Sequence, residues 1–376
     1  MVTAAMSIAG YVLERPFSNA GGGQSEWTFA QKNGTSYFIK RFLKPTYPVD
    51  GGPGSPATKA RKRTQCERFE AHHRTVQRLL NPLSGTGGNL VVTRDFFRHE
   101  ARYFKVTDRV DSSRLPLDEI ARLPVGDQIS LMLAVGSSVH LLHRNALVHG
   151  DLKPDNVLVR HSTGHVFATK LIDFDNCFQA GAPPEPDELV GDPTYYSPEL
   201  MSFMNGAGPA SAIGQASDVF ALALVFAQYL TGQLPSADRG GYLADNLLRG
   251  DEMTLAAVTA DREPVRELIG AMTAVDPAGR PTVTTVIEKL KEARRRAKGL
   301  PVGSPVGSGV GTSRAPGGGP GLRGKGIRTG SSTDTTSTPT LRGTGLGPPK
   351  SEKPVTSAPK LKGKLLDQAR KKAEGC

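Results

Sequence analysis

Cysteine is scarce in this sequence, with Cys66, Cys177 and Cys376 as the only three among 376 residues. No pair of them has the spacing of a zinc site, and three are too few for a disulfide framework. Zinc modules and small disulfide-stapled secreted domains are therefore excluded. This cysteine usage fits a reducing compartment, so we expect a cytoplasmic protein.

Long apolar segments are also missing. The residues up to Phe17 lack the basic start and the apolar core of a signal peptide. The most apolar helical stretch, Val219 to Leu230, has about 12 residues, whereas a helix needs roughly 20 to cross a bilayer. We therefore expect no transmembrane segment.

Most of the chain has almost no excess of one charge. The whole sequence carries 47 Lys or Arg and 36 Asp or Glu, a formal net charge of +11. The segment from Lys298 to Cys376 holds 14 of the basic and 4 of the acidic residues, which leaves 33 and 32 for the rest. We therefore expect no specific nucleic-acid binding. Any attraction to polyanions belongs to the terminal segment, where it is independent of sequence and weakened by salt.

The same terminal segment, 298–376, has few large apolar residues and is dominated by Gly, Pro, Ser and Thr. Because such a composition cannot bury a core, we predict a disordered basic tail. A weak repeat starts at Pro320, Pro339 and Pro359, and each unit places a leucine beside a basic residue. The repeat is either low-complexity drift or a set of docking peptides for an acidic partner, whose individually weak sites would gain from tethering.

The remainder, about 11–297, shows strand patterns first and helix patterns later. Short strands around turn signals, such as Asn33-Gly34, are expected from Tyr11 to Lys40, and two more after a helix at about Lys59 to Leu80. Beyond Leu123 the pattern is mainly helical. We predict an α+β fold with a small β-rich lobe at about 11–107 and a larger helical lobe at about 112–297.

Two segments carry residues suited to phosphate chemistry. The first is HGDLKPDNVLV at His149 to Val159, and the second is LIDFD at Leu171 to Asp175. Together they resemble the HRDLKxxN catalytic loop and the DFG segment of protein kinases. The resemblance implies a bilobal protein kinase fold, ATP and Mg2+ as cofactors, and a protein substrate.

Phosphoryl transfer needs a group that orients the attacking hydroxyl and cations that neutralise the phosphates. In this sequence Asp151 would accept the hydroxyl proton. Lys153, two residues later on an extended loop, would reach the transferring phosphate. Asn156 and Asp173 offer the hard oxygen ligands that suit Mg2+ held jointly with substrate phosphates.

The resemblance extends to the nucleotide contacts. Lys40 follows Phe38 and Ile39 at the place of the family lysine that contacts the α and β phosphates and pairs with a helix glutamate. The helix at about Lys59 to Leu80 has an apolar stripe that runs through Cys66 and His73. On a helical wheel Glu70 lies at the edge of this stripe whereas Glu67 points away, so we choose Glu70 as that partner.

A glycine cluster is expected to cover the phosphates, although it is not a clean GxGxxG. Trp27 stands where the family usually has a valine over the adenine. The cluster consists of Gly21, Gly22 and Gly23, and the three family glycine positions fall on Ala20, Gly22 and Ser25.

Three further features resemble supports of the helical lobe. The SPE segment ending at Glu199 resembles the APE segment, and Asp218 opens an apolar helix as the family's buried aspartate does. Arg280, in DPAGRPT, is expected to pair with Glu199.

Several residues depart from the family pattern. Gly150 replaces an arginine that commonly holds a phosphorylated activation loop, and no Ser, Thr or Tyr occurs between Asp173 and Pro193. We therefore expect activity that is not gated by activation-loop phosphorylation. Asp175 replaces the DFG glycine, which would hinder an inactive flip, and Asp192 replaces a threonine.

The sequence predicts a serine/threonine protein kinase, with Lys153 favouring Ser/Thr hydroxyls and Asp192 weakening that preference. Two alternatives remain: a small-molecule phosphotransferase of the aminoglycoside kinase type, whose loops also read HGD, and a pseudokinase scaffold. The abundance of Ala, Gly and Arg favours a bacterial source.

Overall fold

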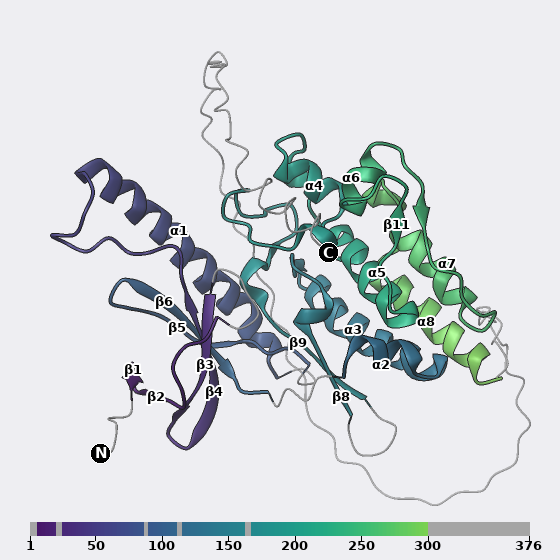
Figure 1. The fold of residues 1–376 in the computed structure, drawn as a ribbon, viewed down its shortest axis with the longest axis horizontal. Helices are drawn as coiled ribbons and strands as arrows, with labels where there is room; N and C mark the ends of the chain where they lie inside the picture. Colours follow the sequence, from purple (N-terminus) through teal and green to yellow (C-terminus); the bar gives the residue numbers. More distant parts are fainter. Residues whose placement is uncertain (1–5, 20–24, 86–88, 111–114, 162–166, 300–376) are drawn as a thin grey trace, which may run out of the picture. The chain divides into compact units, whose positions relative to one another are not determined.

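The computed structural model describes residues 6–19, 25–85, 89–110, 115–161 and 167–299 (Figure 1). The chain divides into two units, Met1–Val302 and Gly303–Cys376, and all described residues belong to the first. The glycine cluster Gly21 to Gly23 and the basic tail with its repeat lie outside the described residues.

The amino-terminal part is built on one antiparallel sheet of six strands in the order β1-β2-β3-β4-β6-β5. The Asn33-Gly34 turn joins β3 to β4 because both of its residues have a positive φ, 52° and 76°, as a two-residue hairpin requires. The strands are β1 Ser7–Ile8, β2 Tyr11–Leu13, β3 Ser25–Lys32, β4 Thr35–Phe42, β5 Thr93–His99 and β6 Arg102–Asp108.

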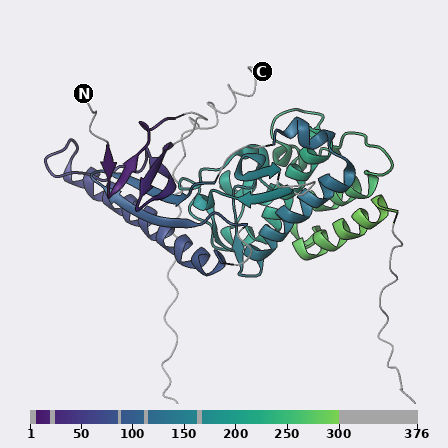
Figure 2. The ribbon, with the colours of Figure 1, turned by 90° about the horizontal axis from the view of Figure 1, so that it is seen from below.

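A long helix, α1 (Pro56–Leu80), packs on one face of this sheet (Figures 1 and 2). It begins with Ser55, whose side chain accepts a hydrogen bond from the backbone N–H of Thr58, and with Pro56 in its first turn. Its buried stripe contains Cys66 and His73, in agreement with the predicted periodicity. This stripe meets the aromatic side chains Phe42, Phe96 and Tyr103.

The carboxyl-terminal part is mainly helical. The apolar helix α5 lies at its centre, buried along almost its whole length, and packs against α2, α3 and α7 (Figure 1). Helix α3 also packs against α8. The helices are α2 Leu117–Arg122, α3 Val125–His143, α4 Pro198–Met204, α5 Gln215–Thr231, α6 Leu243–Leu248, α7 Glu263–Met272 and α8 Val283–Ala297.

Short strands and 3-10 turns complete this part. Strand β7 pairs with β10, β8 with β9, and β11 with β12, each pair antiparallel. The strands are β7 Leu147–Val148, β8 Val157–His161, β9 Phe167–Leu171, β10 Phe178–Gln179, β11 Ser236–Ala237 and β12 Met253–Thr254. The 3-10 turns of this part are η2 Pro154–Asn156, η3 Phe174–Asn176, η4 Pro193–Tyr195, η5 Ala210–Ala212 and η6 Pro277–Gly279, whereas η1 Asn81–Leu83 follows α1 in the amino-terminal part.

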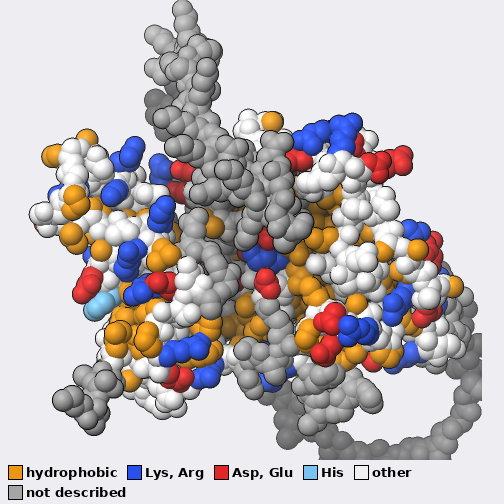
Figure 3. Space-filling view, in the orientation of Figure 1, with side chains coloured by type: hydrophobic (Ala, Val, Ile, Leu, Met, Phe, Trp, Pro, Cys, Tyr) orange, Lys and Arg blue, Asp and Glu red, His pale blue; other side chains and the backbone are white. Residues whose placement is uncertain are grey.

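The predicted α+β class, with a small β-rich lobe before a larger helical lobe, is confirmed. On the face drawn in Figure 3, basic and acidic side chains are scattered among each other over both lobes. This distribution agrees with the nearly equal numbers of the two kinds of charge outside the tail.

One helix among the described residues, α3, passes a test for membrane-spanning length and composition, and 50% of its most apolar window is buried. The apolar stretch Val219 to Leu230 lies in α5, which has 17 residues. Core helices of soluble proteins pass the same test, and α3 packs on two other helices, so this is weak evidence for a membrane span.

Candidate functional site

Two short strand pairs bring the phosphate-handling segments together. Because β8 and β9 pair from Val157 opposite Leu171, Asn156 and Asp173 lie at the same end of this hairpin. The backbone N–H of Ile172 also donates to the Asn156 carbonyl at 2.9 Å. In the same way, the β7–β10 pair places the start of the catalytic loop next to the segment that follows Asp173.

Asp218, in the first turn of α5, anchors the loop before Asp151. It is 2% exposed and accepts hydrogen bonds from the backbone N–H groups of His149 at 2.8 Å and Gly150 at 3.1 Å. His143 Nε2 lies 3.0 Å from the same carboxylate. The buried aspartate predicted to open this helix is confirmed, and it fixes the loop backbone.

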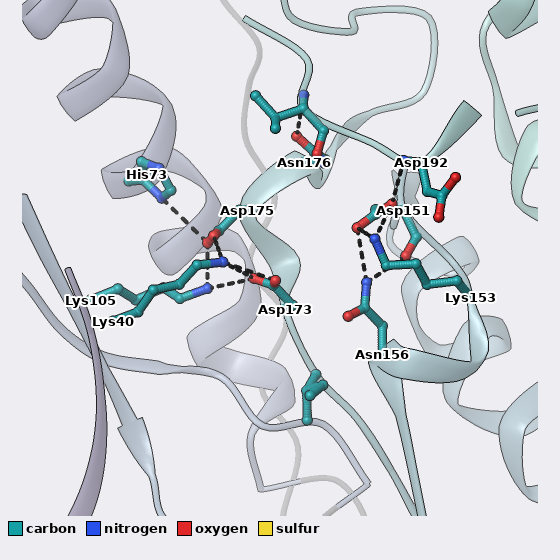
Figure 4. A network of polar contacts seen from close by, with 12 residues as sticks. Lys40, His73, Lys105, Asp151, Lys153, Asn156, Asp173, Asp175, Asn176 and Asp192 are labelled. Carbon is teal, nitrogen blue, oxygen red and sulfur yellow. Dashed lines mark hydrogen bonds and ion pairs between the residues drawn. The ribbon is translucent and has the colours of Figure 1, made fainter. Parts of the chain in front are cut away.

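Asp151 lies at the centre of a small polar cluster (Figure 4). Its carboxylate accepts hydrogen bonds from Lys153 Nζ at 2.9 and 3.1 Å, Asn156 Nδ2 at 3.0 Å and the backbone N–H of Asp192 at 3.2 Å. Burial raises the pKa of Asp151 above its ordinary value, and the Lys153 ammonium opposes this rise. The structure thus brings Asp151, Lys153 and Asn156 together.

A second cluster lies beside the first and joins both lobes (Figure 4). Lys40 Nζ, from β4, donates to both carboxylate oxygens of Asp173 at 2.9 and 3.1 Å and to Asp175 Oδ2 at 2.6 Å. Lys105 Nζ, from β6, donates to Asp173 Oδ1 at 3.0 Å and also contacts Asp175 Oδ1. Two ammonium groups and two carboxylates therefore share one partly buried space, with side chains between 5% and 31% exposed.

These charges hold one another ionised. Burial would raise the pKa of Asp173, but the Lys105 and Lys40 ammonium groups hold it well below its ordinary value. Burial would lower the pKa of Lys40, yet Asp173 and Asp175 raise it. Asp173 also has a left-handed backbone, with φ of 61°, which is uncommon outside glycine and concentrated at functional sites.

Glu70 does not pair with Lys40 in this structure, which differs from our expectation. Glu70 is half-buried at the edge of the α1 stripe, as the helical wheel indicated, but Oε1 accepts a hydrogen bond from the Tyr103 hydroxyl at 2.7 Å. Its other oxygen lies 3.7 Å from Arg74. Because Asp175 and Asp173 lie within hydrogen-bond distance of Lys40, they take the place predicted for Glu70.

Sequence reasoning missed Lys105 and the pairing role of Asp175. Two signals pointed to them. Lys105 interrupts the otherwise apolar run Tyr103 to Val106, where a lysine needs a buried partner. Asp175 adds a second carboxylate to the LIDFD segment, two residues after Asp173. The extra lysine and the extra carboxylate are therefore of opposite charge and can pair.

Gly150 has a structural reason that the sequence did not show. Its φ is 76°, and a Cβ built on it would lie 2.5 Å from the carbonyl oxygen of Asn176. Asn176 holds together the two ends of the activation segment, residues 173–193, because its side chain donates to the Val190 carbonyl at 3.0 Å and accepts from the Val190 N–H at 3.3 Å. No side chain fits at position 150 without moving this segment.

Aromatic rings lie on the sheet face that carries Lys40. Trp27 is directly opposite Lys40 in the β3–β4 register, and directly opposed residues share a face. Trp27 and Phe38 stack with their centroids 5.7 Å apart and an interplanar angle of 25°. Arg15 lies over the Trp27 ring at 4.5 Å. A flat aromatic surface therefore adjoins the lysine.

The predicted support between Glu199 and Arg280 is confirmed. The Arg280 guanidinium makes two bonds to the Glu199 carboxylate, at 2.7 and 2.8 Å, and both side chains are almost fully buried. Arg280 also donates to the backbone carbonyls of Ala216 and Ala274. This pair fixes α4, whose first turn contains Glu199.

Comparisons with known proteins agree with this geometry. Residues 57–290 match the family model described as a protein kinase domain. The chain is 27% identical over 180 residues to a probable serine/threonine-protein kinase, gdt4, of Dictyostelium discoideum, covering 47% of this chain and 11% of that protein. It is 28% identical over 177 residues to the serine/threonine-protein kinase Pkn1 of Myxococcus xanthus, covering 46% and 24%. It is 31% identical over 204 residues to mitogen-activated protein kinase kinase 5 of Leishmania mexicana, covering 51% and 36%. The matched region is thus well under half of each relative's length.

Proposed function

Because this chain belongs to the protein kinase family, we propose that it transfers the γ-phosphoryl group of ATP, with Mg2+, to serine or threonine hydroxyls of proteins. The observation that carries the proposal is the meeting of Lys40, Asp151, Asn156 and Asp173 in two adjoining clusters. These residues come from a sheet strand, a loop and a hairpin end, so only the fold brings them together.

Asp151 is the group that orients the substrate hydroxyl and accepts its proton. Its carboxylate is held by donors on both oxygens, and its raised pKa favours taking up a proton during transfer. Lys153, which donates to the Asp151 carboxylate in this structure, is placed to neutralise charge on the transferring phosphoryl group. These contacts supply positioning and electrostatic stabilisation, the two main needs of phosphoryl transfer.

Asp173 and Asn156 fit a Mg2+ ion that substrate phosphates help to hold. Among the described residues no three His, Cys, Asp or Glu side chains form a metal site of their own. One carboxylate beside one amide oxygen is instead the donor set expected when phosphates supply further ligands. The ion would neutralise charge on the phosphates, while Lys40 would contact them from the sheet side. The stacked rings of Trp27 and Phe38 offer a flat surface to a purine base.

The activation segment has the features of one that is ordered without a phosphate. Asn176 ties it at Val190, and the Asp192 backbone donates to Asp151. Asn176 thereby orders the activation segment, which in other kinases is ordered by contact between an arginine at the place of Gly150 and a phosphorylated residue. We infer that phosphatase-treated enzyme keeps most of its activity.

The choice of Ser/Thr hydroxyls is supported by Lys153 and by the names of the relatives. Asp192, which stands where such kinases usually have threonine, uses its carboxylate to accept the Thr194 N–H at 3.0 Å. The Asp192 side chain therefore caps the η4 turn, and Lys153 donates to Asp151.

The test uses the full chain with labelled ATP, Mg2+ and myelin basic protein, followed by phosphoamino-acid analysis. Phosphoserine or phosphothreonine is expected. Asp151→Asn should abolish transfer and leave ATP binding largely intact, whereas Asp173→Asn should weaken Mg-nucleotide binding as well. Labelling of an aminoglycoside instead of protein would favour the small-molecule alternative. ATP binding without transfer would favour a pseudokinase, and wild-type turnover in both variants would refute the kinase assignment.

A further inference from the structure

Two lysines face each other on adjacent strands of the sheet. Lys40 on β4 is the direct register partner of Lys105 on β6. Their side chains are only 16% and 5% exposed. Like charges directly opposite each other destabilise a sheet, and a buried ammonium without a partner is strongly disfavoured. The two strands can carry this pair only if carboxylates lie between them.

Asp175 meets this need for both lysines at once. One oxygen accepts from Lys40 at 2.6 Å and the other contacts Lys105. Asp175 is thus a partly buried carboxylate, 17% exposed, whose lysine partners come from two different strands.

Asp175 also connects this cluster to α1. His72 Nε2–H donates to the backbone carbonyl of Asp175 at 2.6 Å, and His73 Nδ1 lies 3.9 Å from its carboxylate. Burial lowers the pKa of His73 to about 3, so its ring is neutral near pH 7. Glu70, one turn before His73 on the same helix, accepts its hydrogen bond from the Tyr103 hydroxyl.

We propose that the Lys105–Asp175 ion pair is the positioning element that holds α1 and Lys40 against Asp173, in place of an ion pair between Lys40 and Glu70. This inference rests on the proposed function. When Asp173 faces Mg2+ and Lys40 faces the phosphates, Lys105 keeps Asp175 as its partner. The strand β6, the LIDFD segment and α1 therefore stay joined while Lys40 changes partners.

The test is a double-mutant cycle with Lys105→Met, Asp175→Asn and the double variant, together with Glu70→Gln. Each single change removes one charge from the cluster of two lysines and two aspartates and leaves an excess of the opposite sign. We therefore expect kcat/KM to fall by about 10²-fold, the loss expected when catalytic groups are slightly misplaced. The KM for ATP should rise, because Lys40 is no longer held in place. The double variant should recover part of the loss, since neither charge remains.

Glu70→Gln should keep kcat and the KM for ATP within about twofold, because the amide can still accept from Tyr103. Glu26→Gln is the matched control: it removes a carboxylate that pairs with Arg41, the neighbour of Lys40, but lies outside the cluster. It should also leave both constants within about twofold, as expected for a partly exposed ion pair.

Thermal unfolding of the protein without nucleotide gives a second reading that does not need catalysis. Both single variants should melt below the unmodified protein, and the double variant should melt above the lower of the two. Hydrogen exchange of the α1 amides around His72 should accelerate in Asp175→Asn and stay unchanged in Glu70→Gln.

The outcomes separate the two proposals. Loss of activity in Glu70→Gln together with normal activity in Lys105→Met would overturn the inference and leave the kinase assignment standing. Strictly additive effects on melting and on kcat/KM would also overturn it. If the unmodified chain transfers no phosphate, the assignment fails, and the melting and exchange data alone decide whether Lys105 and Asp175 hold α1.

Discussion

The substitution Gly150→Ala tests why this chain has no arginine in its catalytic loop. Alanine adds a single Cβ, which would lie 2.5 Å from Asn176 O and 3.1 Å from a ring carbon of Phe178. Real Cβ atoms do not approach a backbone oxygen so closely, so either the loop or the segment after Asp173 must move. The backbone at Gly150 also has φ of 76°, which an L residue rarely adopts.

The expected loss of stability has two parts. The left-handed backbone costs an alanine about 1–2 kcal/mol. Forcing an extra carbon into a filled space typically costs a further 1–3 kcal/mol, roughly. The free energy of unfolding should therefore fall by about 2–5 kcal/mol, out of about 5–15 kcal/mol for a typical domain.

Gly34→Ala provides a matched control in the same protein. Gly34 has the same φ of 76°, but nothing lies within 4 Å of the position that its Cβ would take. It should lose only the backbone contribution of about 1–2 kcal/mol. Urea unfolding followed by circular dichroism measures both variants, and kcat should fall only in Gly150→Ala because Asp151 follows directly. Equal losses of stability in the two variants would show that the close contact with Asn176 has no energetic effect.

Three further predictions concern other parts of the structure. Glu199→Gln leaves the buried guanidinium of Arg280 without its counter-charge, so we expect a loss of about 3–5 kcal/mol in thermal or urea unfolding; a change under 1 kcal/mol, roughly that of an exposed pair, would contradict this. Asn176→Ala removes both hydrogen bonds that tie the activation segment, so limited proteolysis should cut that segment faster, at a cost of about 1–3 kcal/mol in stability; an unchanged cleavage rate would refute the role given to this side chain. Cys66 and Cys177 are buried, and burial raises the pKa of both thiols. Iodoacetamide at pH 8 should therefore modify them only after unfolding, and peptide mass spectrometry that finds either one alkylated in the native protein would contradict their burial.

The sequence by itself determined the local features of this protein. The alternation around Asn33-Gly34 and the helical stripe through Cys66 and His73 depend on residues close together in the chain, and both appear as predicted. The segments that contain Asp151 and Asp173 indicated phosphoryl transfer through their resemblance to protein kinase motifs, and the structure joins their ends through the β8–β9 pair. Asp218 was predicted from the resemblance to protein kinases, in which a buried aspartate opens this helix, and the structure shows it buried and bonded to backbone N–H groups.

Only the tertiary structure decided which charges meet. A helical wheel gives the face on which Glu70 lies, but it cannot show that Tyr103 on another strand supplies its donor. The register of β4 against β6 sets Lys105 opposite Lys40, and that register depends on pairing between distant segments. Gly150 looked like the loss of an arginine, and the fold shows instead that the Asn176 carbonyl fills the space. Electrostatic and steric contacts of this kind depend on distances of a few ångströms between segments far apart in sequence. The sequence therefore shows which charged residues are present, but only the packed fold determines which of them are in contact.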